Sequence, residues 1–144
     1  VTLVMGKCDS EPPVFVNTVK VQSAKDMYDA VIERADSMDI IVKAAAVADY
    51  RPKNVSSEKV KKQDGNMSIE LERTDDILKT LGERKNGQFI CGFSMETENM
   101  LENSRKKLEK KNCDMIVANN LKQDGAGFGG NTNIVTLITK DDKR

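Results

Sequence analysis

The 144-residue sequence contains no histidine and no tryptophan, and it has only three cysteines, Cys8, Cys91 and Cys113. Without histidine, the commonest general base and metal ligand is absent. A Ser-His-Asp or Cys-His hydrolase is therefore excluded for an active site built from this chain alone. An odd number of cysteines with no C-x-x-C spacing argues against a disulfide framework and against a zinc site. A transfer reaction driven by charge stabilisation remains open, because lysines, backbone N–H groups and a metal can support it.

The sequence also lacks net charge and long apolar runs. Lys+Arg and Asp+Glu both number 23, so no overall field favours nucleic acid or a membrane as partner, and any anion site must be built locally. No apolar run approaches the ~20 residues that span a bilayer, and no charged-then-apolar leader opens the chain. We therefore expect a cytoplasmic protein. With 38% hydrophobic and 32% charged residues, the composition is that of one soluble globular domain.

Short apolar runs alternate with amphipathic patterns along the chain. Strands are expected at 1–4, 14–21, 39–47, 67–71, 88–93, 115–118 and 134–139, and helices at 24–35, 75–84 and 98–111. Ser23, Thr74 and Thr97 are the expected helix caps. This order predicts an α/β fold: a Rossmann-like, doubly wound, mostly parallel sheet with helices on both faces. The run at 39–47 suits a strand covered on both faces, and the polar residues 49–66 suit a long surface loop.

Chemically unusual residues follow several of these strands. In open parallel sheets, ligands bind outside the carboxyl ends of the strands. The small side chains of Ala44, Ala45 and Ala46 would let a base or a phosphate approach the backbone closely, and Asp49 adds a carboxylate just past the strand. Phe93 could stack on a base. Each of these residues also fits an ordinary turn or core position, so the pattern alone leaves both interpretations open.

Lysines form two further candidate groups. Lys59, Lys61 and Lys62 lie in the long loop, where they could close over a triphosphate and offset its charge. Lys107 and Lys111 are four residues apart on one helix face, so both could reach the same anion. A solvated charged surface is the alternative explanation for either group. Each group by itself is explained equally well by a solvated surface. The order of these lysines and of the strand-end residues along one α/β chain favours a functional site.

That order resembles bacterial phosphopantothenate–cysteine ligase. The matching blocks are Ala-Ala-Val-Ala-Asp-Tyr-Arg (45–51), Glu-Lys-Val-Lys-Lys (58–62), Gly-Phe-Ser-Met-Glu-Thr (92–97), Lys-Lys-Asn-Cys-Asp-Met-Ile-Val-Ala-Asn (110–119) and Gly-Phe (127–128). The resemblance implies that CTP activates 4′-phosphopantothenate as an acyl-cytidylate with release of pyrophosphate. The amine of cysteine then displaces CMP, in a step of coenzyme A biosynthesis.

The resemblance also implies a site. Backbone groups at 43–45 would line the cytidine, and Lys59 would be the catalytic flap lysine on the phosphates. Asp75 stands where relatives commonly have proline. Mg²⁺ is expected to enter with the triphosphate, without an assigned protein ligand, and a homodimer is expected. The implied nucleotide-binding residues are Lys43, Ala44, Ala45, Asp49, Lys59, Asp75, Asp76, Ile77, Leu78, Phe93, Lys107 and Lys111.

Compared with the family, residues 1–144 are expected to be a single nucleotide-binding ligase domain truncated at both ends. The family begins with a strand and a loop ending Asn-x-Ser-Ser-Gly, whose Asn assists acyl-cytidylate formation, and it ends with a helix after the last strand. We find no counterpart of these segments here, so the fragment alone is expected to be inactive. Many bacterial ligases are fused behind a flavin-dependent decarboxylase, and FMN is expected only with such a domain.

Two other interpretations stay open. A nicotinamide-dependent, NAD(P)-binding oxidoreductase could share the architecture, but the sequence has no Gly-rich first turn and no Tyr-x-x-x-Lys pair, because Asn54 follows Tyr50 at that spacing. A non-catalytic dimerisation module could pair the strand at 134–139 across two chains. Binding of CTP, of NAD(P) or of neither distinguishes the three.

Overall fold

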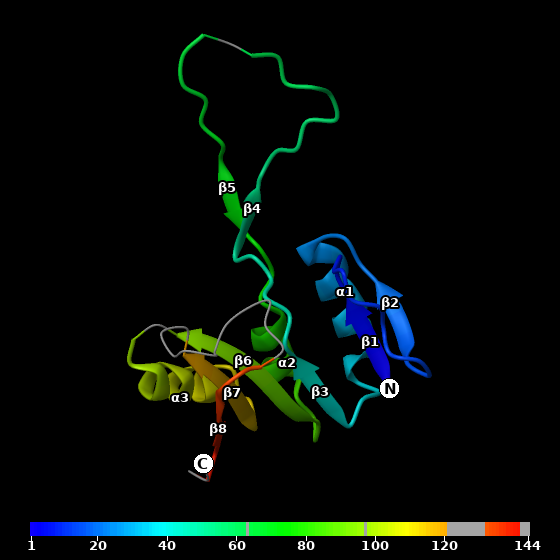
Figure 1. The fold of residues 1–144 in the computed structure, drawn as a ribbon, viewed down its shortest axis with the longest axis vertical. Coiled ribbons are helices and arrows are strands. Elements are labelled where there is room, and N and C mark those ends of the chain that lie inside the picture. The colour runs from blue at the N-terminus through cyan, green and yellow to red at the C-terminus, as the bar shows by residue number, and fades with distance from the viewer. Residues whose placement is uncertain (63, 97, 121–131, 142–144) are drawn as a thin grey trace.

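The computed structural model describes residues 1–62, 64–96, 98–120 and 132–141. Figure 1 shows its elements in chain order. Three helices lie within these residues: α1 (Ala24–Ala35), α2 (Ile77–Arg84) and α3 (Met100–Lys110). The strands are β1 (Thr2–Met5), β2 (Asn17–Lys20), β3 (Ile40–Lys43), β4 (Tyr50–Pro52), β5 (Leu71–Arg73), β6 (Phe89–Glu96), β7 (Met115–Asn120) and β8 (Val135–Thr139).

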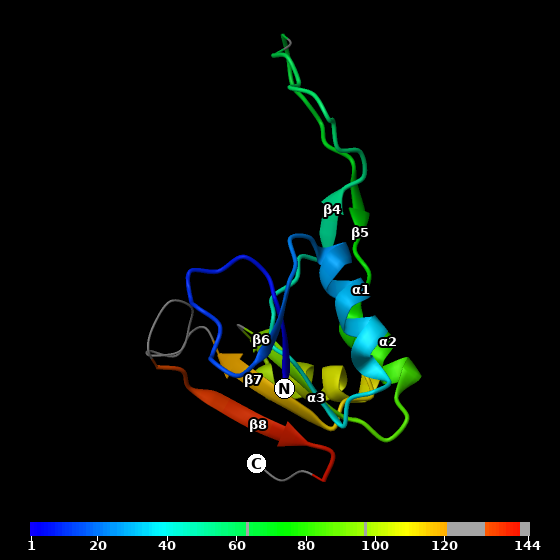
Figure 2. The ribbon, with the colours of Figure 1, turned by 90° about the vertical axis from the view of Figure 1, so that its right-hand side faces the viewer.

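The central sheet has four strands in the order β3-β6-β7-β8. β3, β6 and β7 run parallel, and β8 is antiparallel to β7. β1 and β2 form a separate parallel pair, while β4 and β5 form an antiparallel hairpin that projects from the body (Figures 1 and 2). The expected α/β class with a mostly parallel central sheet is confirmed.

The core lies between the helices and one face of the central sheet. Ile90, Ile116 and Ile138 point from three neighbouring strands into a cluster with Leu78 of α2 and Leu108 of α3. Side chains of α1 pack against the same cluster. Helices were expected on both faces; in the described part of the chain, all three cover this one face.

The strand expected at 39–47 was wrong in its length and its burial. β3 ends at Lys43, and Val42 is 60% exposed. The physical reason is position: β3 is an edge strand whose outer face carries no helix among the described residues. Its apolar sequence therefore does not mean burial on both faces.

The three helix caps have different outcomes. Ser23 caps α1 in a capping box, because its side chain accepts a hydrogen bond from the N–H of Asp26 while the Asp26 carboxylate accepts one from the N–H of Ser23. Thr74 does not cap α2; Asp76 does, accepting from the N–H of Lys79 at 2.9 Å. Thr97 lies outside the described residues, and α3 starts after Asn99, which has a left-handed backbone (φ 48°).

The polar segment 49–66 was expected to be a loop and 67–71 a strand, and both assignments need correction. Tyr50–Pro52 pairs with Leu71–Arg73, so the strands form only the base of a long hairpin. We call residues 50–62 and 64–73 the arm. Thr74 joins the two strands at the base of the arm through two hydrogen bonds. The Thr74 hydroxyl donates to the carbonyl oxygen of Ala48 (2.6 Å), and the Thr74 N–H donates to the carbonyl oxygen of Asp49 (3.0 Å).

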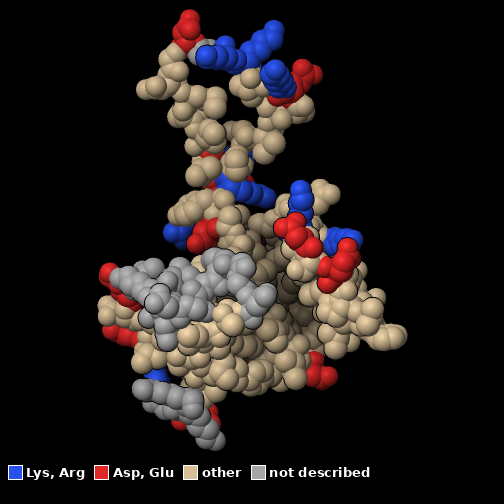
Figure 3. All heavy atoms as spheres, viewed as in Figure 1, with Lys and Arg blue, Asp and Glu red and all other residues tan. Residues whose placement is uncertain are grey.

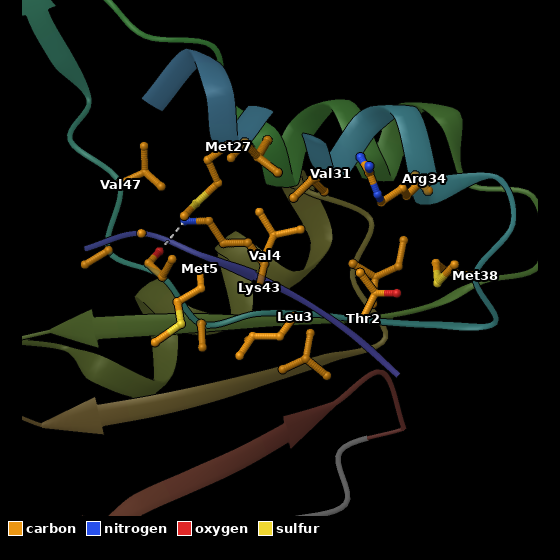
Figure 4. Close-up of a pocket in the computed structure, with 18 of the residues that line it drawn as sticks. Thr2, Leu3, Val4, Met5, Met27, Val31, Arg34, Met38, Lys43 and Val47 are labelled. Carbon is orange, nitrogen blue, oxygen red and sulfur yellow. Dashed lines mark hydrogen bonds between the residues drawn. The ribbon is translucent and has the colours of Figure 1, made fainter. Parts of the chain in front are cut away.

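An apolar groove separates β1 from β3. Its cavity of about 610 Å³ is lined by both strands, by residues 44–47 and by one face of α1. Figure 4 looks into it, with Met27 and Val31 of α1 on one side and Leu3, Val4 and Met5 of β1 on the other. In the strand pairings of the described residues, β1 pairs with β2 and β3 with β6, so the edges facing the groove are unpaired.

Candidate functional site

A second, more polar cavity of about 390 Å³ lies at the carboxyl end of β3, below the base of the arm. It brings together nine of the twelve residues expected to bind the nucleotide. These are Lys43, Asp49, Asp75, Asp76, Ile77, Leu78, Phe93, Lys107 and Lys111. Of the other three, Ala44 and Ala45 line the neighbouring apolar groove, and Lys59 lies on the arm.

The fold explains why residues distant in sequence meet here. β3 and β6 are parallel neighbours with Lys43 opposite Gly92, so Lys43 and Phe93 reach the same end of the sheet. α3 packs against β6 and β7. It contributes Lys107 from its last turn, and Lys111 follows its last residue. The amino end of α2 adds Asp76 and Ile77.

Asp76 and Lys111 form an ion pair at one wall of this cavity. The Lys111 side chain is only 16% exposed. Partial burial raises the pKa of Asp76. The hydrogen bonds from Lys111 and from the N–H of Lys79, together with the charges of Lys111 and Lys43, lower it by more, so the pKa ends below its ordinary value. The carboxylate therefore stays ionised and holds the Lys111 ammonium in place.

Among the described residues, the other two ammonium groups in the cavity are bound only by backbone carbonyls. Lys107 donates to the carbonyl oxygen of Phe93 at 2.8 Å, and Lys43 donates to that of Ala45 at 2.8 Å (Figure 4). Burial, and then repulsion from Lys107, lower the pKa of Lys43. Within the described residues, neither lysine has a carboxylate partner within ion-pair distance. Cations of this kind suit an anionic ligand, which would supply the missing counter-charge.

Sequence reasoning missed four lining residues: Val47, Tyr50, Arg73 and Thr74. Tyr50 and Arg73 are opposite each other in the hairpin, and the Arg73 guanidinium lies 5.8 Å from the centroid of the Tyr50 ring. The signal was the alternation of apolar and polar residues from Met67 to Glu72, which extends the expected strand to the residue before Arg73. Pairing that strand with Tyr50–Pro52 would have placed both residues at the site.

The structure does not bring Lys59 to the cavity. Lys59, Lys61 and Lys62 are exposed on the far part of the arm, beyond the β4–β5 pairing. The block Gly127-Phe128 lies outside the described residues. Among those that are described, no group of three or more Asp, Glu or Cys side chains could hold a metal ion. No helix in the same set is both long and apolar enough to cross a membrane.

Comparison with known proteins assigns the fold to a family. The C-terminal domain of the DNA/pantothenate metabolism flavoprotein matches residues 1–144. The chain belongs to this family.

Several members of the DNA/pantothenate metabolism flavoprotein family are close in sequence. The coenzyme A biosynthesis bifunctional protein CoaBC of Bacillus subtilis is 53% identical over 131 residues, which cover 91% of this chain and 32% of that protein. The corresponding CoaBC of Vibrio cholerae is 41% identical, covering 98% of this chain and 36% of that protein. The chain thus spans about a third of these relatives. A crystal structure of a CoaBC C-terminal domain superposes with a TM-score of 0.79 at 46% identity, covering 99% of this chain and 61% of that one.

Proposed function

We propose that this chain belongs to the ligase part of a coenzyme A biosynthesis enzyme, which uses CTP to join 4′-phosphopantothenate to cysteine. The observation that carries the proposal is the cavity, where nine residues expected at a nucleotide site converge although they come from distant segments. The name of the Bacillus subtilis relative, a coenzyme A biosynthesis bifunctional protein, supports the pathway. The activity is a property of the longer protein to which such a domain belongs.

The proposed reaction has two transfers. First, a carboxylate oxygen of 4′-phosphopantothenate attacks the α-phosphorus of CTP, and the bond to pyrophosphate breaks. The cysteine amine then attacks the acyl carbon, the bond to the CMP phosphate breaks, and the amine loses a proton to solvent. Both steps move negative charge among phosphate oxygens, so positioning and charge stabilisation are the main contributions required of the protein.

The cavity offers groups for both contributions. Lys107 and Lys43 would exchange their backbone carbonyl partners for phosphate oxygens, forming charge-assisted hydrogen bonds. Phe93 offers an aromatic face to a base, and the Asp76–Lys111 pair offers an acceptor and a donor in fixed positions. Mg²⁺ bound with the triphosphate would add charge neutralisation. No protein ligand for it is assigned.

A thermal-shift panel tests the proposal. The longer protein, and this chain where it folds, would be melted with CTP, ATP or NADPH, each with and without Mg²⁺. A ligand present at about 100 times its Kd stabilises the folded state by roughly 2.7 kcal/mol, so CTP with Mg²⁺ should raise the Tm by several degrees. Equal stabilisation by ATP would refute pyrimidine specificity. Stabilisation by NADPH alone would favour the oxidoreductase alternative.

A further inference from the structure

Arg73 differs from the other basic residues on the paired strands of the arm. Arg51 forms an ion pair with Glu72 at 2.8 Å. Lys53 likewise pairs with Glu70 at 2.7 Å. Arg73 is the last residue of β5 and lines the polar cavity, yet no carboxylate of the described residues lies within ion-pair distance of it. Its positive charge is therefore left for a ligand to balance.

The Tyr50 ring restricts the Arg73 side chain. The two residues are opposite each other in the hairpin, and the guanidinium carbon lies over the ring, 5.8 Å from its centroid. The hydroxyl of Thr74, the next residue, donates to the carbonyl oxygen of Ala48 at 2.6 Å and holds the backbone there. Contact with the ring leaves the N–H groups of the guanidinium available as donors. An arginine held in this way can bind an anion through two parallel hydrogen bonds.

Arg73 and the lysines of the cavity come from different walls. Lys107 belongs to α3 and Lys43 ends β3, whereas Arg73 belongs to the base of the arm. Figure 3 shows basic and acidic side chains gathered where the arm joins the body. This wall is open to water, since Tyr50 is 50% exposed. The cavity therefore has an exposed cationic position that is separate from its lysines.

The acid in the proposed reaction has two anionic groups, one at each end. Its carboxylate must lie beside the α-phosphorus of CTP, where Lys43 and Lys107 would bind phosphate oxygens. Its phosphate monoester is at the other end of the molecule, where no bond forms or breaks. Complete burial of such a doubly charged group is costly. An exposed arginine away from the reacting atoms is therefore a suitable partner for it.

We propose that Arg73, held over Tyr50, binds the phosphate monoester of the acid substrate and so positions its carboxylate for attack on the nucleotide. This inference rests on the proposed ligase function. Binding energy from a non-reacting part of a substrate holds the reacting end in place. The guanidinium fork matches two phosphate oxygens, a geometry that a lysine ammonium does not reproduce.

Steady-state kinetics of the longer protein provides the first test. In Arg73→Met, the KM for 4′-phosphopantothenate should rise about tenfold or more, the effect of losing a hydrogen-bonded charge, while the KM for CTP stays unchanged. Arg73→Lys should recover only part of the loss. Arg51→Met is the matched control, because Arg51 is on the same arm, pairs with Glu72 and does not line the cavity. Equal melting temperatures would show that all three variants keep the fold.

Removing the phosphate from the substrate provides the second test. Pantothenate has the same carboxylate but no phosphate monoester. It should therefore compete with 4′-phosphopantothenate with the same inhibition constant in wild type and in Arg73→Met. The two acids and the two proteins form a cycle that isolates the contact between Arg73 and the phosphate. Equal weakening of both acids would overturn the proposal, and so would a raised KM for CTP, which would assign Arg73 to the triphosphate.

These outcomes separate the two proposals. An active wild type, beside an Arg73→Met variant with an unchanged KM for the acid, would overturn the role of Arg73 and leave the ligase function intact. A wild type that forms no CTP-dependent CMP would instead refute the ligase function and, with it, the role of Arg73.

Discussion

A methyl group at Gly82 would stand 1.9 Å from the carbonyl oxygen of Lys111. The amide of Asn112 donates to the carbonyl oxygen of Gly82 at 3.0 Å, so α2 and the end of α3 are in backbone contact. This close approach positions the Lys111 ammonium beside Asp76, the residue that caps α2. A glycine outside the cavity thereby fixes the charges inside it.

Gly82→Ala should therefore destabilise the fold and weaken nucleotide binding together. The added methyl must push backbone apart, and overpacking of this kind costs about 1–3 kcal/mol or more. Urea unfolding and CTP titration would measure the two effects. Gly6→Ala is the matched control, because its nearest neighbour would be a Met27 methyl at an ordinary 3.8 Å. Equal stability of the two variants would contradict the close approach.

Lys107→Met should lower CTP affinity without unfolding the chain. Lys107 lines the cavity, and among the residues that the structure describes its ammonium group is bound only by the Phe93 carbonyl, so it would give a phosphate a charged donor. Losing it should weaken binding by about tenfold or more, equivalent to roughly 1.4 kcal/mol. Lys106→Met is the control, because Lys106 points to solvent and pairs with Glu102. Calorimetric titration would compare them, and equal loss in both would remove Lys107 from the site.

Asp114→Asn should lower the free energy of unfolding at neutral pH and make that free energy depend less on pH in the acid range. Asp114 accepts hydrogen bonds from Lys85 (2.6 Å) and from the N–H of Ile90 (2.8 Å). Partial burial raises its pKa, but these bonds and the attraction of Lys85 and Lys140 bring it below the ordinary value. A carboxyl group with a depressed pKa stabilises the fold above its unfolded pKa, and that contribution disappears as pH falls through the folded pKa.

Wild type should therefore lose this contribution below about pH 4, and the variant should lack about 1–3 kcal/mol at pH 7 because Lys85 is left nearly buried and unpaired. Denaturant unfolding at several pH values measures both. Asp36→Asn is the control: its pair with Arg84 is exposed, and its loss should change stability by less than about 0.5 kcal/mol. If the stability of Asp114→Asn followed the same pH profile as that of the wild type, the hydrogen bonds of Asp114 with Lys85 and Ile90 would not be stabilising.

Thiol labelling should modify one cysteine per native chain. Cys8 is exposed, whereas Cys91 and Cys113 are buried. Burial, followed by the nearby charge of Asp114, raises the pKa of Cys113 to about 11, and burial also raises that of Cys91. Because the thiolate is the reactive form, a colorimetric disulfide reagent should react quickly with one thiol in the native state and with three after unfolding. Rapid reaction of two or more native thiols would show an open core.

Local chemistry in the sequence is enough to predict the class of the fold, the cap of α1 and most of the cavity lining. The Ser23 capping box needs only four neighbouring residues, and strands that alternate with helices favour parallel pairing. Residues that follow parallel strands converge at one end of a sheet, so Lys43, Asp49 and Phe93 can be grouped from the strand pattern alone. The order of the motifs, which resembles that of the ligase family, also predicts that residues of α2 and α3 belong to the cavity lining.

Partners across long sequence distances depend on the tertiary structure instead. The Asp76–Lys111 pair spans 35 residues, and the pairing of Tyr50 with Arg73 makes the base of the arm part of the cavity wall. Thr74 has no capping role because its hydroxyl binds the Ala48 carbonyl. The apolar run of β3 favours a doubly covered strand, yet its place at a sheet edge leaves one face bare. Strand order, register and helix approach depend on which distant surfaces pack together, and no local pattern specifies that choice.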